Sequence, residues 1–341
     1  GHESVKKLNG IFAFAIWDRK KKELFIARDH LGVKPFYYFT NDKQFIFSSE
    51  IKAILEHPIP RKFNPEAFNH YLRILYVPGP LTMFDGIYKL PPASFGIVKD
   101  GILTIQKYWQ VEPGNYLTES QKDIEKETLN KISKSVERQL ISDRPLGIYL
   151  SGGIDSSAVL HYVAQKHREI NTFSVGFNLQ NEKTEEKFNA DLNLAKKTAM
   201  YYGTSHHEVI LSTEDVPELF MKAIRHMDEP ISNPTALAMM KLAAFAKNNV
   251  AVVLGGDGGD ELFGGYDRYR LSLIASYYQK IPRALRMLFL WNDKLRKLNT
   301  AAGIKRFALF MFQKDNILER TICPGWLNMT ISEEFFNKKY F

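Results

Sequence analysis

The stretch Ser151-Gly152-Gly153-Ile154-Asp155-Ser156-Ser157 lies between a short apolar run at 146–150 and a segment of helical pattern that begins near Ser156. A strand that turns through glycines into a helix predicts an anion site. The first N–H groups of a helix lack partners, and the helix dipole is positive there. Gly152 and Gly153 would let the backbone approach such a ligand closely. We therefore predict a phosphate-binding turn after this strand.

The polar side chains of the turn refine this prediction. Ser151 and Ser156 provide hydroxyl donors, whereas Asp155 beside a phosphate indicates an intervening cation such as Mg²⁺. The turn lacks the Gly-x-x-x-x-Gly-Lys-Ser/Thr pattern, and the chain has no Gly-x-Gly-x-x-Gly, so a Walker-type loop and a dinucleotide fold are excluded. A glycine turn in which a Ser or Asp merely caps the helix is the less favoured alternative.

A second glycine-rich stretch follows the apolar run at 250–254. Residues 255–266 read Gly-Gly-Asp-Gly-Gly-Asp-Glu-Leu-Phe-Gly-Gly-Tyr, and six glycines with three acids are difficult to explain as packing. Ligands of open α/β sheets bind at the carboxyl ends of the strands, where this stretch lies. Its acids can hold a metal or position a reacting group. The two stretches together predict a grip for pyrophosphate with carboxylates beside it, as adenylation of a carboxylic acid requires.

The remaining pattern indicates two domains with different folds. Residues 1–110 are rich in short β-type runs at 11–17, 23–27, 35–39 and 44–47, with a hairpin turn at Lys99-Asp100-Gly101. A helix is expected after the fourth run, with Ser48 or Ser49 as its N-cap. Residues 111–120 are expected to form a linker.

From residue 121 to 341 the pattern predicts an α/β domain with a parallel sheet, because apolar strands alternate with helices. The expected strands are 146–150, 171–177, 208–211 and 250–254. The expected helices are 124–140, 156–167, 188–202 with Gly203 as C-terminal cap, 213–227 and 235–247, and a mostly helical region from about 266.

Composition bounds the class of protein. The chain has 341 residues, 45% apolar and 25% charged, which fits about two globular domains and excludes a disordered or fibrous chain. No apolar run is long enough for a membrane-spanning helix, so no membrane partner is expected. The single cysteine, Cys323, excludes an intrachain disulfide and favours a reducing, cytoplasmic location.

The net charge of +8 comes from scattered basic residues, densest between Arg283 and Arg306. A solvated helical surface explains them better than a nucleic-acid site, so no nucleic-acid partner is expected. The chain begins with Gly1 and ends in Tyr340-Phe341, from which we expect a fragment of a longer protein, cut at both ends.

The motifs resemble those of a known family. Ser-Gly-Gly-x-Asp-Ser at 151–156 is similar to the pyrophosphate loop of ATP pyrophosphatases, and Asp-Glu-Leu-Phe-Gly-Gly-Tyr at 260–266 resembles glutamine-hydrolysing asparagine synthetases of the bacterial type. The stretches 8–18 and 28–38 look like the later part of that family's glutaminase domain. The resemblance implies an αββα glutaminase remnant before the α/β ATP-pyrophosphatase domain.

The resemblance also implies an activity: aspartate is amidated to asparagine through β-aspartyl-AMP, with ATP and Mg²⁺, and glutamine or free ammonia supplies the nitrogen. A homodimer is one assembly to test. The acid implied for acyl-adenylate formation is Asp257, and the implied metal-side acids are Asp155 and Asp260. The implied ATP-binding residues are Tyr149, Ser151, Gly152, Gly153, Asp155, Ser156, Val175, Gly255 and Gly256.

Two departures from the family and two alternatives qualify this interpretation. The family's nucleophilic N-terminal cysteine has no counterpart in the sequence, so we expect no glutamine hydrolysis by this stretch alone, and the synthetase part is expected to be incomplete at its C-terminal end. Gly255 stands where relatives often have Ser. The alternatives are a related enzyme that amidates a sugar acid or closes a β-lactam ring, and a catalytically inactive remnant.

Other conspicuous residues receive structural interpretations. His206-His207-Glu208 would alternate sides of a strand, which does not favour a metal site. Arg28-Asp29 is interpreted as a structural turn pair at the domain interface. Asp228-Glu229-Pro230 and Asn233-Pro234 are interpreted as a turn between helices, with lining of the substrate pocket as the alternative.

Overall fold

The computed structural model describes residues 2–112, 114, 118–179, 182–266 and 269. The chain forms two compact units. The N-terminal unit comprises the described residues of Gly1–Tyr116 and Ile224–Ser232, and the second unit those of Leu117–Ala223 and Asn233–Thr321. Cys323, the basic residues between Arg283 and Arg306, and most of the helical region expected from about 266 lie outside the described residues.

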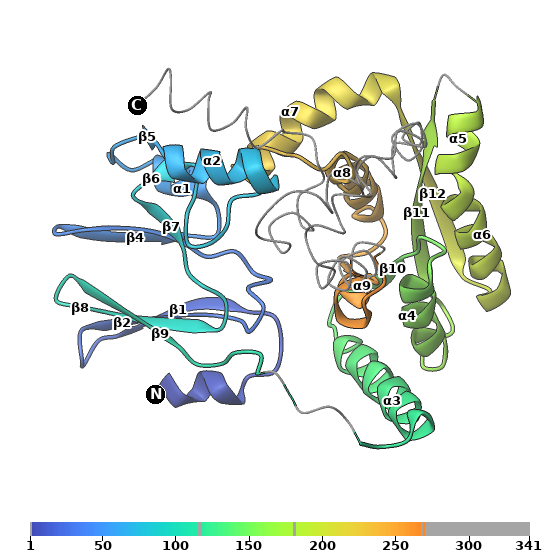
Figure 1. The fold of residues 1–341 in the computed structure, drawn as a ribbon, viewed down its shortest axis with the longest axis horizontal. Coiled ribbons are helices and arrows are strands. Elements are labelled where there is room, and N and C mark those ends of the chain that lie inside the picture. Colours follow the sequence, from blue (N-terminus) through green and yellow to red (C-terminus); the bar gives the residue numbers. More distant parts are fainter. Residues whose placement is uncertain (1, 113, 115–117, 180–181, 267–268, 270–341) are drawn as a thin grey trace, which may run out of the picture. The chain divides into compact units, whose positions relative to one another are not determined.

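The N-terminal unit contains two facing antiparallel sheets (Figure 1). One has the strand order β1-β2-β8-β9 and the other β4-β3-β7. The strands are β1 (Ala13–Asp18), β2 (Glu23–Arg28), β3 (Tyr37–Asn41), β4 (Gln44–Ser48), β7 (Ile87–Lys89), β8 (Ser94–Lys99) and β9 (Ile102–Lys107). A short pair, β5 (Lys62–Phe63) and β6 (Phe84–Asp85), is separate.

Apolar side chains from both sheets form the central core of this unit, with Ile26, Phe36, Tyr38 and Leu90 buried at its centre. Helix α1 (Ile51–Leu55) packs on the outer face of the second sheet through Ile51 and Ile54. The 3-10 helix η1 (His2–Lys7) covers the outer face of the first sheet, and α2 (Pro65–Ile74) forms its own small cluster. The two sheets carry helical segments on their outer faces, as in the expected αββα type, but the segment on the first sheet is the 3-10 helix η1.

The second unit has a parallel sheet of order β12-β11-β10-β13. Its strands are β10 (Leu146–Tyr149), β11 (Asn171–Asn178), β12 (Ser205–Ser212) and β13 (Val252–Leu254). Its helices are α3 (Gln121–Gln139), α4 (Ile154–Ala164), α5 (Glu182–Phe188), α6 (Ala190–Tyr202), α8 (Thr235–Ala246), α9 (Gly259–Phe263) and the greater part of α7 (Val216–Met227), which follows the 3-10 turn η2 (Thr213–Asp215).

Helices cover both faces of this sheet, with α4 and α6 on one side and α8 on the other (Figure 1). One core surrounds Ile148 and Leu160, and the other surrounds Phe173 and Leu242. Burial on both faces explains the continuous apolar runs of the strands. The predicted α/β class and parallel sheet are therefore confirmed.

Most local predictions are confirmed, because they rest on short-range rules. Asp100 and Gly101 take positive φ angles of 50° and 81° between β8 and β9, as the predicted hairpin turn requires. Gly203 caps α6 in the left-handed region at φ 64°. The helix expected at 124–140 is present as α3, and its N-cap Ser120, which was not predicted, accepts the N–H of Asp123 at 3.3 Å.

Two local predictions are wrong. The predicted helix at 188–202 is interrupted at Asn189, whose side chain accepts the N–H of Phe177 and donates to its carbonyl, each at 2.8 Å, so that Phe188 belongs to α5. Neither Ser48 nor Ser49 is the N-cap of α1. Glu50 holds that position without a side-chain cap bond, because the N–H groups of the first turn have an acceptor elsewhere in the chain.

No helix in the described part of the chain combines the length and the apolar character needed to cross a bilayer.

Candidate functional site

The two glycine-rich stretches meet at one edge of the parallel sheet. Strand β10 leads into the loop before α4, and β13 leads into residues 255–258 before α9. The strands are parallel neighbours, with Ile148 opposite Leu254, so their carboxyl ends lie side by side. The chain proceeds from β10 to β11 and β12 on one side and then adds β13 on the other. Such a reversal of strand order is where open α/β sheets bind ligands.

The first loop requires glycine and leaves helix N–H groups available. Gly152 has φ +75°, and a Cβ there would lie 2.6 Å from Cβ of Leu194 and 2.7 Å from the carbonyl oxygen of Asp191 on α6. Gly153 is the N-cap of α4 and makes no side-chain cap hydrogen bond. The first turn of this eleven-residue helix is therefore a candidate anion site of the predicted kind.

The two serine hydroxyls of the loop bond to each other and to the loop itself. Ser156 is 4% exposed, and its Oγ accepts the N–H of Ser151 at 3.2 Å. The Oγ of Ser151 lies 3.0 Å from that of Ser156 and accepts the N–H of Gly153 at 3.3 Å. The sequence pattern predicts that these hydroxyls donate to the ligand. In this structure they close the turn, which shapes the backbone around the N–H groups.

The second loop lies directly against the first. A Cβ at Gly256 would be 2.6 Å from the backbone nitrogen of Ser156 and 2.7 Å from Cβ of Asp155. A Cβ at Gly259 would be 2.6 Å from Oδ2 of Asp155. Only glycine allows this approach at either position. The sequence analysis did not single out Gly259, although its place among the six glycines of the stretch was a signal.

Carboxylates gather where the loops meet. Burial raises the pKa of Asp155, and the negative charges of Asp260 and Glu261 raise it further. No lysine, arginine or histidine pairs with Asp155 among the described residues. Glu261, the third acid of the glycine-rich stretch, was given no role of its own from the sequence, and it accepts a hydrogen bond from the hydroxyl of Tyr266 at 2.7 Å. The charge of Asp155 thus has negative neighbours and no paired protein cation in the described part of the chain.

This donor set fits a magnesium ion that is shared with phosphates. The described residues contain no group of three His, Cys, Asp or Glu side chains placed to hold a metal. Mg²⁺ is commonly held by one or two carboxylates together with substrate phosphates and water, and not by a cage of protein ligands. Asp155 and Asp260, near the first turn of α4 that has no side-chain cap, meet that description.

Asp257 and Gly255 are brought to the same edge. Asp257 stands between β13 and α9, and its Oδ2 would be 2.8 Å from a Cβ at Gly255. Gly258, with φ +95°, turns the chain into α9. A side chain at Gly255 would therefore displace the Asp257 carboxylate, so the glycine at this position affects where that acid lies.

Tyr149 and Val175 lie on the α8 face of the sheet. Tyr149 ends β10 opposite Phe173, and Val175 lies in β11 opposite Val209. Both pack against the cluster of Phe173 and Leu242, and burial raises the pKa of the Tyr149 hydroxyl. Their packing partners are thus the residues of this core cluster.

His206 and His207 are held separately within β12. His206 Nδ1 bonds Oγ1 of Thr172 at 2.9 Å, whereas His207 Nε2 bonds Oδ1 of Asn171 at 3.0 Å and its ring stacks on Phe173. The two rings therefore have different partners and do not converge on a common ligand.

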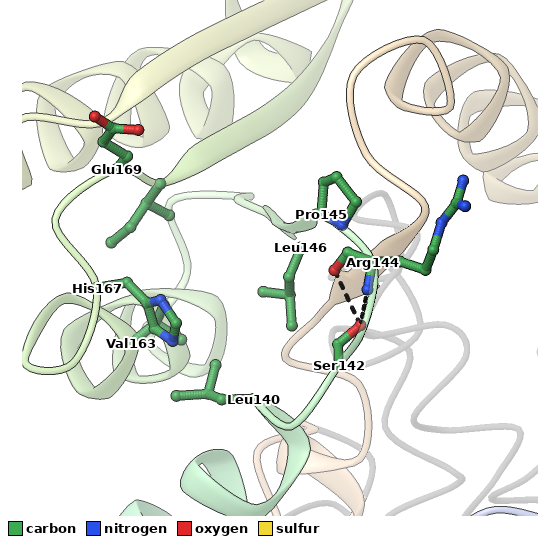
Figure 2. A pocket seen from close by; sticks show the side chains of 9 residues that line it. Leu140, Ser142, Arg144, Pro145, Leu146, Val163, His167 and Glu169 are labelled. Atoms are coloured by element: carbon green, nitrogen blue, oxygen red, sulfur yellow. Dashed lines mark hydrogen bonds between the residues drawn. The ribbon is translucent and has the colours of Figure 1, made fainter.

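A cavity of about 240 Å³ lies at the opposite edge of the sheet (Figure 2). It is lined by Leu146 at the start of β10, Val163 of α4 and Ile170 just before β11. The Ser142 hydroxyl donates to the carbonyl of Arg144 and accepts its N–H. The hydrogen bonds of this hydroxyl are therefore made within the turn at 142–144. This cavity is at the amino ends of the strands, so it is not the site predicted from the two loops.

Comparison with protein families gives two matches. The sequence model described as "Asparagine synthase" matches residues 127–322, and that described as "Glutamine amidotransferase domain" matches residues 1–109.

Individual relatives agree with these matches. "Asparagine synthetase [glutamine-hydrolyzing] 1" of Bacillus subtilis is 36% identical over 84% of the chain and 44% of its own length. "Putative asparagine synthetase [glutamine-hydrolyzing] 2" of Methanocaldococcus jannaschii is 34% identical over 84% of the chain and 56% of its length. "Amidase chyE" of Penicillium rubens is 28% identical over 94% of the chain and 49% of its length. The chain thus spans about half the length of these relatives.

Among solved structures, the NH3-dependent NAD synthetase from Campylobacter jejuni is 17% identical, covering 59% of the chain and all of that protein, with a TM-score of 0.28.

Proposed function

Since the chain belongs to the asparagine synthase family, we propose that the complete protein is an ATP-dependent ligase that amidates aspartate to asparagine through β-aspartyl-AMP. Glutamine supplies the ammonia. The observation that carries this proposal is the meeting of two glycine loops at the switch point of the sheet, where uncapped N–H groups of α4 lie beside Asp155.

Each residue of the site receives a role from its position. The loop of Ser151, Gly152, Gly153 and Ser156 with the first turn of α4 binds the pyrophosphate part of ATP. Asp155 and Asp260 hold the metal, Gly255 and Gly256 let the nucleotide approach, and Asp257 promotes formation of the acyl-adenylate. Tyr149 and Val175 contact the adenine near the strand ends. These assignments rest on the loop geometry and on the family.

Mg²⁺ fits the carboxylates described above, and when bound it would neutralise phosphate charge and assist departure of pyrophosphate. Asp155 and Asp260 would be its protein ligands. The raised pKa of Asp155 supports this assignment, because a carboxylate repelled by its neighbours gains most from a cation. The N–H groups of α4 would hold the leaving pyrophosphate by hydrogen bonds that need no rearrangement.

The chemistry follows from the inertness of a free carboxylate towards amines. A side-chain oxygen of aspartate attacks the α-phosphorus of ATP, the bond between the α-phosphorus and the bridging oxygen breaks, and pyrophosphate leaves. Ammonia then attacks the acyl carbon, the bond to the AMP oxygen breaks, and the nitrogen loses a proton. The products are asparagine, AMP and pyrophosphate. A reducing cytoplasm, consistent with a single cysteine, is part of the proposal.

Exchange of labelled pyrophosphate into ATP tests this function in the complete natural protein. Aspartate should support exchange, whereas other carboxylic acids should not. The variant Asp155→Asn should lower the exchange on the order of 10²-fold, because a metal ligand is lost, and Asp100→Asn in the exposed hairpin turn should leave it unchanged. Failure of aspartate to support exchange would reject the proposed acceptor.

A second candidate is amidation of a different acid, such as a sugar acid, or closure of a β-lactam ring. The similarity to "Amidase chyE", which extends over 94% of the chain, favours keeping this candidate. It shares the adenylation chemistry and differs only in the acceptor. Exchange that depends on another acid and not on aspartate would support it, whereas absence of exchange with every acid would indicate an inactive remnant.

A further inference from the structure

A short segment from the middle of the second unit's sequence belongs to the N-terminal unit. The chain leaves the second unit after Ala223, passes through Ile224–Ser232 in the N-terminal unit, and returns at Asn233. The segment includes the last turn of α7, and two residues separate its end from α8 (Thr235–Ala246). The sequence pattern of 228–234 predicts a turn between helices. Its contacts indicate a larger role.

Asp228 caps helix α1 across a long sequence separation. Its Oδ2 accepts the N–H groups of Ile51 at 2.8 Å and Lys52 at 3.2 Å, and also pairs with Nζ of Lys52. The local N-cap, Glu50, makes no side-chain cap bond. The Asp228 side chain is 10% exposed. The first turn of α1 therefore depends on an acceptor 177 residues away in the sequence.

Glu229 forms a second contact, in which both partners are largely buried. Nζ of Lys89 donates to its Oε2 at 2.9 Å and to the carbonyl of Val77 at 3.0 Å. The side chains of Lys89 and Glu229 are each 16% exposed. The other carboxylate oxygen of Glu229 is buried without a hydrogen-bond partner among the described residues. Burial raises the pKa of Glu229, while Lys89 opposes that effect.

Ser232 fixes the far end of the segment. Its hydroxyl donates to the carbonyl of Leu75 at 2.6 Å. Leu75 ends α2 in the left-handed region at φ 65°. The segment is thus attached to three separate parts of the N-terminal unit: the start of α1, strand β7 and the end of α2.

The conformation and burial of these two acids cost free energy that a simple turn would not require. Asp228 has φ +56°, a conformation that glycine or asparagine adopts more easily. A buried carboxylate with one unpaired oxygen contributes little net stability, because its desolvation opposes the attraction to its partner. Buried, directional hydrogen bonds such as those of Asp228 and Glu229 favour one position of the segment Ile224–Ser232 over other positions. Residues held in a strained backbone conformation, as Asp228 is, are associated with functional sites.

We propose that Asp228 and Glu229 are positioning residues that hold the segment Ile224–Ser232, and with it the chain entering α8, in the arrangement needed to use nitrogen released from glutamine. This inference rests on the proposed function. The two carboxylates do not touch the reacting atoms. They act through the position of the segment, so the reaction with free ammonia should depend on them much less than the reaction with glutamine.

The test compares two nitrogen sources in the complete natural protein. The variants are Asp228→Asn and Glu229→Gln, and the matched control is Glu218→Gln, an exposed acid paired with Lys222 on α7. The measured quantity is amide product formed per glutamate released. It should fall about fivefold in the two variants, in the range of ordinary coupling between sites. Amide formation with saturating ammonia, glutamine hydrolysis and the control variant should each change by less than about twofold.

A rescue variant separates coupling from stability. Lys89→Gln combined with Glu229→Gln keeps a hydrogen bond and removes the buried charge that Glu229→Gln alone leaves on Lys89. The double variant should restore most of the amide product formed per glutamate released. If Glu229→Gln alone fails to fold, the double variant is measured in its place. An unchanged ratio in the single variants overturns the inference, and so does an equal fall of both half-reactions, which would indicate a merely structural role.

Measurements on the wild-type protein distinguish failure of the proposed function from failure of the positioning role. Amidation of another acid would reject aspartate as the acceptor, and the ratio would then be measured with that acid. Normal aspartate amidation with unchanged ratios in the variants would reject the positioning role alone. A wild-type protein that hydrolyses glutamine and amidates no acid would reject both.

Discussion

Two turns of this protein contain glycine and aspartate, but the surroundings of the two aspartates differ. The turn at residues 28–34 follows β2, and the loop at 151–156 follows β10, and each combines glycine with an aspartate near the end of a strand. In the first turn Asp29 is 1% exposed, and its carboxylate accepts the N–H groups of Val33 and Lys34, each at 3.0 Å. Burial alone would raise the pKa of Asp29, but these hydrogen bonds outweigh it and the pKa is lowered.

Arg28 completes the first turn from the other side. Its guanidinium donates to the carbonyls of Leu90 at 2.6 Å, Gly32 at 2.7 Å and Lys34 at 2.7 Å. Donors and acceptors of this turn are thereby paired within it or with its neighbouring strand. Such pairing is typical of a structural turn, as the sequence interpretation held for this pair.

The loop at 151–156 differs, because no protein cation in the described part of the chain pairs with its aspartate. Asp155 faces Asp260 and Glu261, its pKa is raised, and the N–H groups at the start of α4 have no side-chain cap. The comparison teaches that the partners of an aspartate, and not its presence beside glycine, separate a structural turn from a binding site.

The largest effect should come from closing the space between the two glycine loops. In Gly256→Ala, the new methyl group would lie 2.6 Å from the backbone nitrogen of Ser156, which cannot move without the loop. We expect pyrophosphate exchange to fall on the order of 10³-fold, because the N–H groups that bind phosphate would be displaced. Gly10→Ala, where a Cβ meets nothing within 4 Å, is the control. Retained exchange in Gly256→Ala would mean that nucleotide binds elsewhere.

Neutralising Asp155 should separate activity from stability. Asp155→Asn should lower exchange on the order of 10²-fold, because a metal ligand is lost. The raised folded-state pKa means that protonation stabilises the protein below the ordinary value of 3.8, and that this stabilisation is lost as the pH rises through the folded-state pKa. The variant should therefore be at least as stable as the wild type at pH 7, in urea unfolding without metal. A marked loss of stability would show that Asp155 has a structural partner.

The opposite behaviour is expected of Asp29. Asp29→Ala leaves the N–H groups of Val33 and Lys34 without their acceptor, so the free energy of unfolding should fall by about 2–3 kcal/mol. Because the folded-state pKa of Asp29 is lowered, its contribution is present above pH 3.8 and is lost as the pH falls through the folded-state pKa. Urea titrations of the variant and of the exposed control Asp42→Ala, at several pH values, measure both effects. Equal stability of the two variants would contradict the structural role.

The smallest effect should come from Ser156, whose hydroxyl closes the loop at 151–156. Ser156→Ala removes the acceptor of the Ser151 N–H and the donor to the Gly153 carbonyl, so we expect a loss of about 1 kcal/mol in stability. Exchange should fall by less than about tenfold, because the backbone N–H groups remain. Thermal unfolding and exchange measured on the same sample test this. A loss as large as that of Gly256→Ala would show that the hydroxyl itself binds the ligand.

Local sequence patterns were sufficient for most of the fold. The alternating strands and helices, the hairpin turn at Asp100-Gly101 and the cap at Gly203 were all foreseen, because each depends on periodicity or on the backbone freedom of residues close in sequence. The two wrong predictions have a common cause. Asn189 bonds to β11, and Asp228 caps α1, so in both places a distant or tertiary partner decided a helix boundary.

For the candidate site, too, some features follow from the sequence and others only from the tertiary structure. Residue types and spacing alone identified the glycine loops at 151–156 and 255–266, since only glycine tolerates such turns and approaches and since a loop after a parallel strand must lie at the carboxyl edge. The tertiary structure decided that Gly259 contacts Asp155, that Glu261 adds its charge, and that Ile224–Ser232 joins the N-terminal unit. Each of these depends on partners brought together by packing of the chain, and sequence separation carries no record of which carboxylate will meet which backbone N–H.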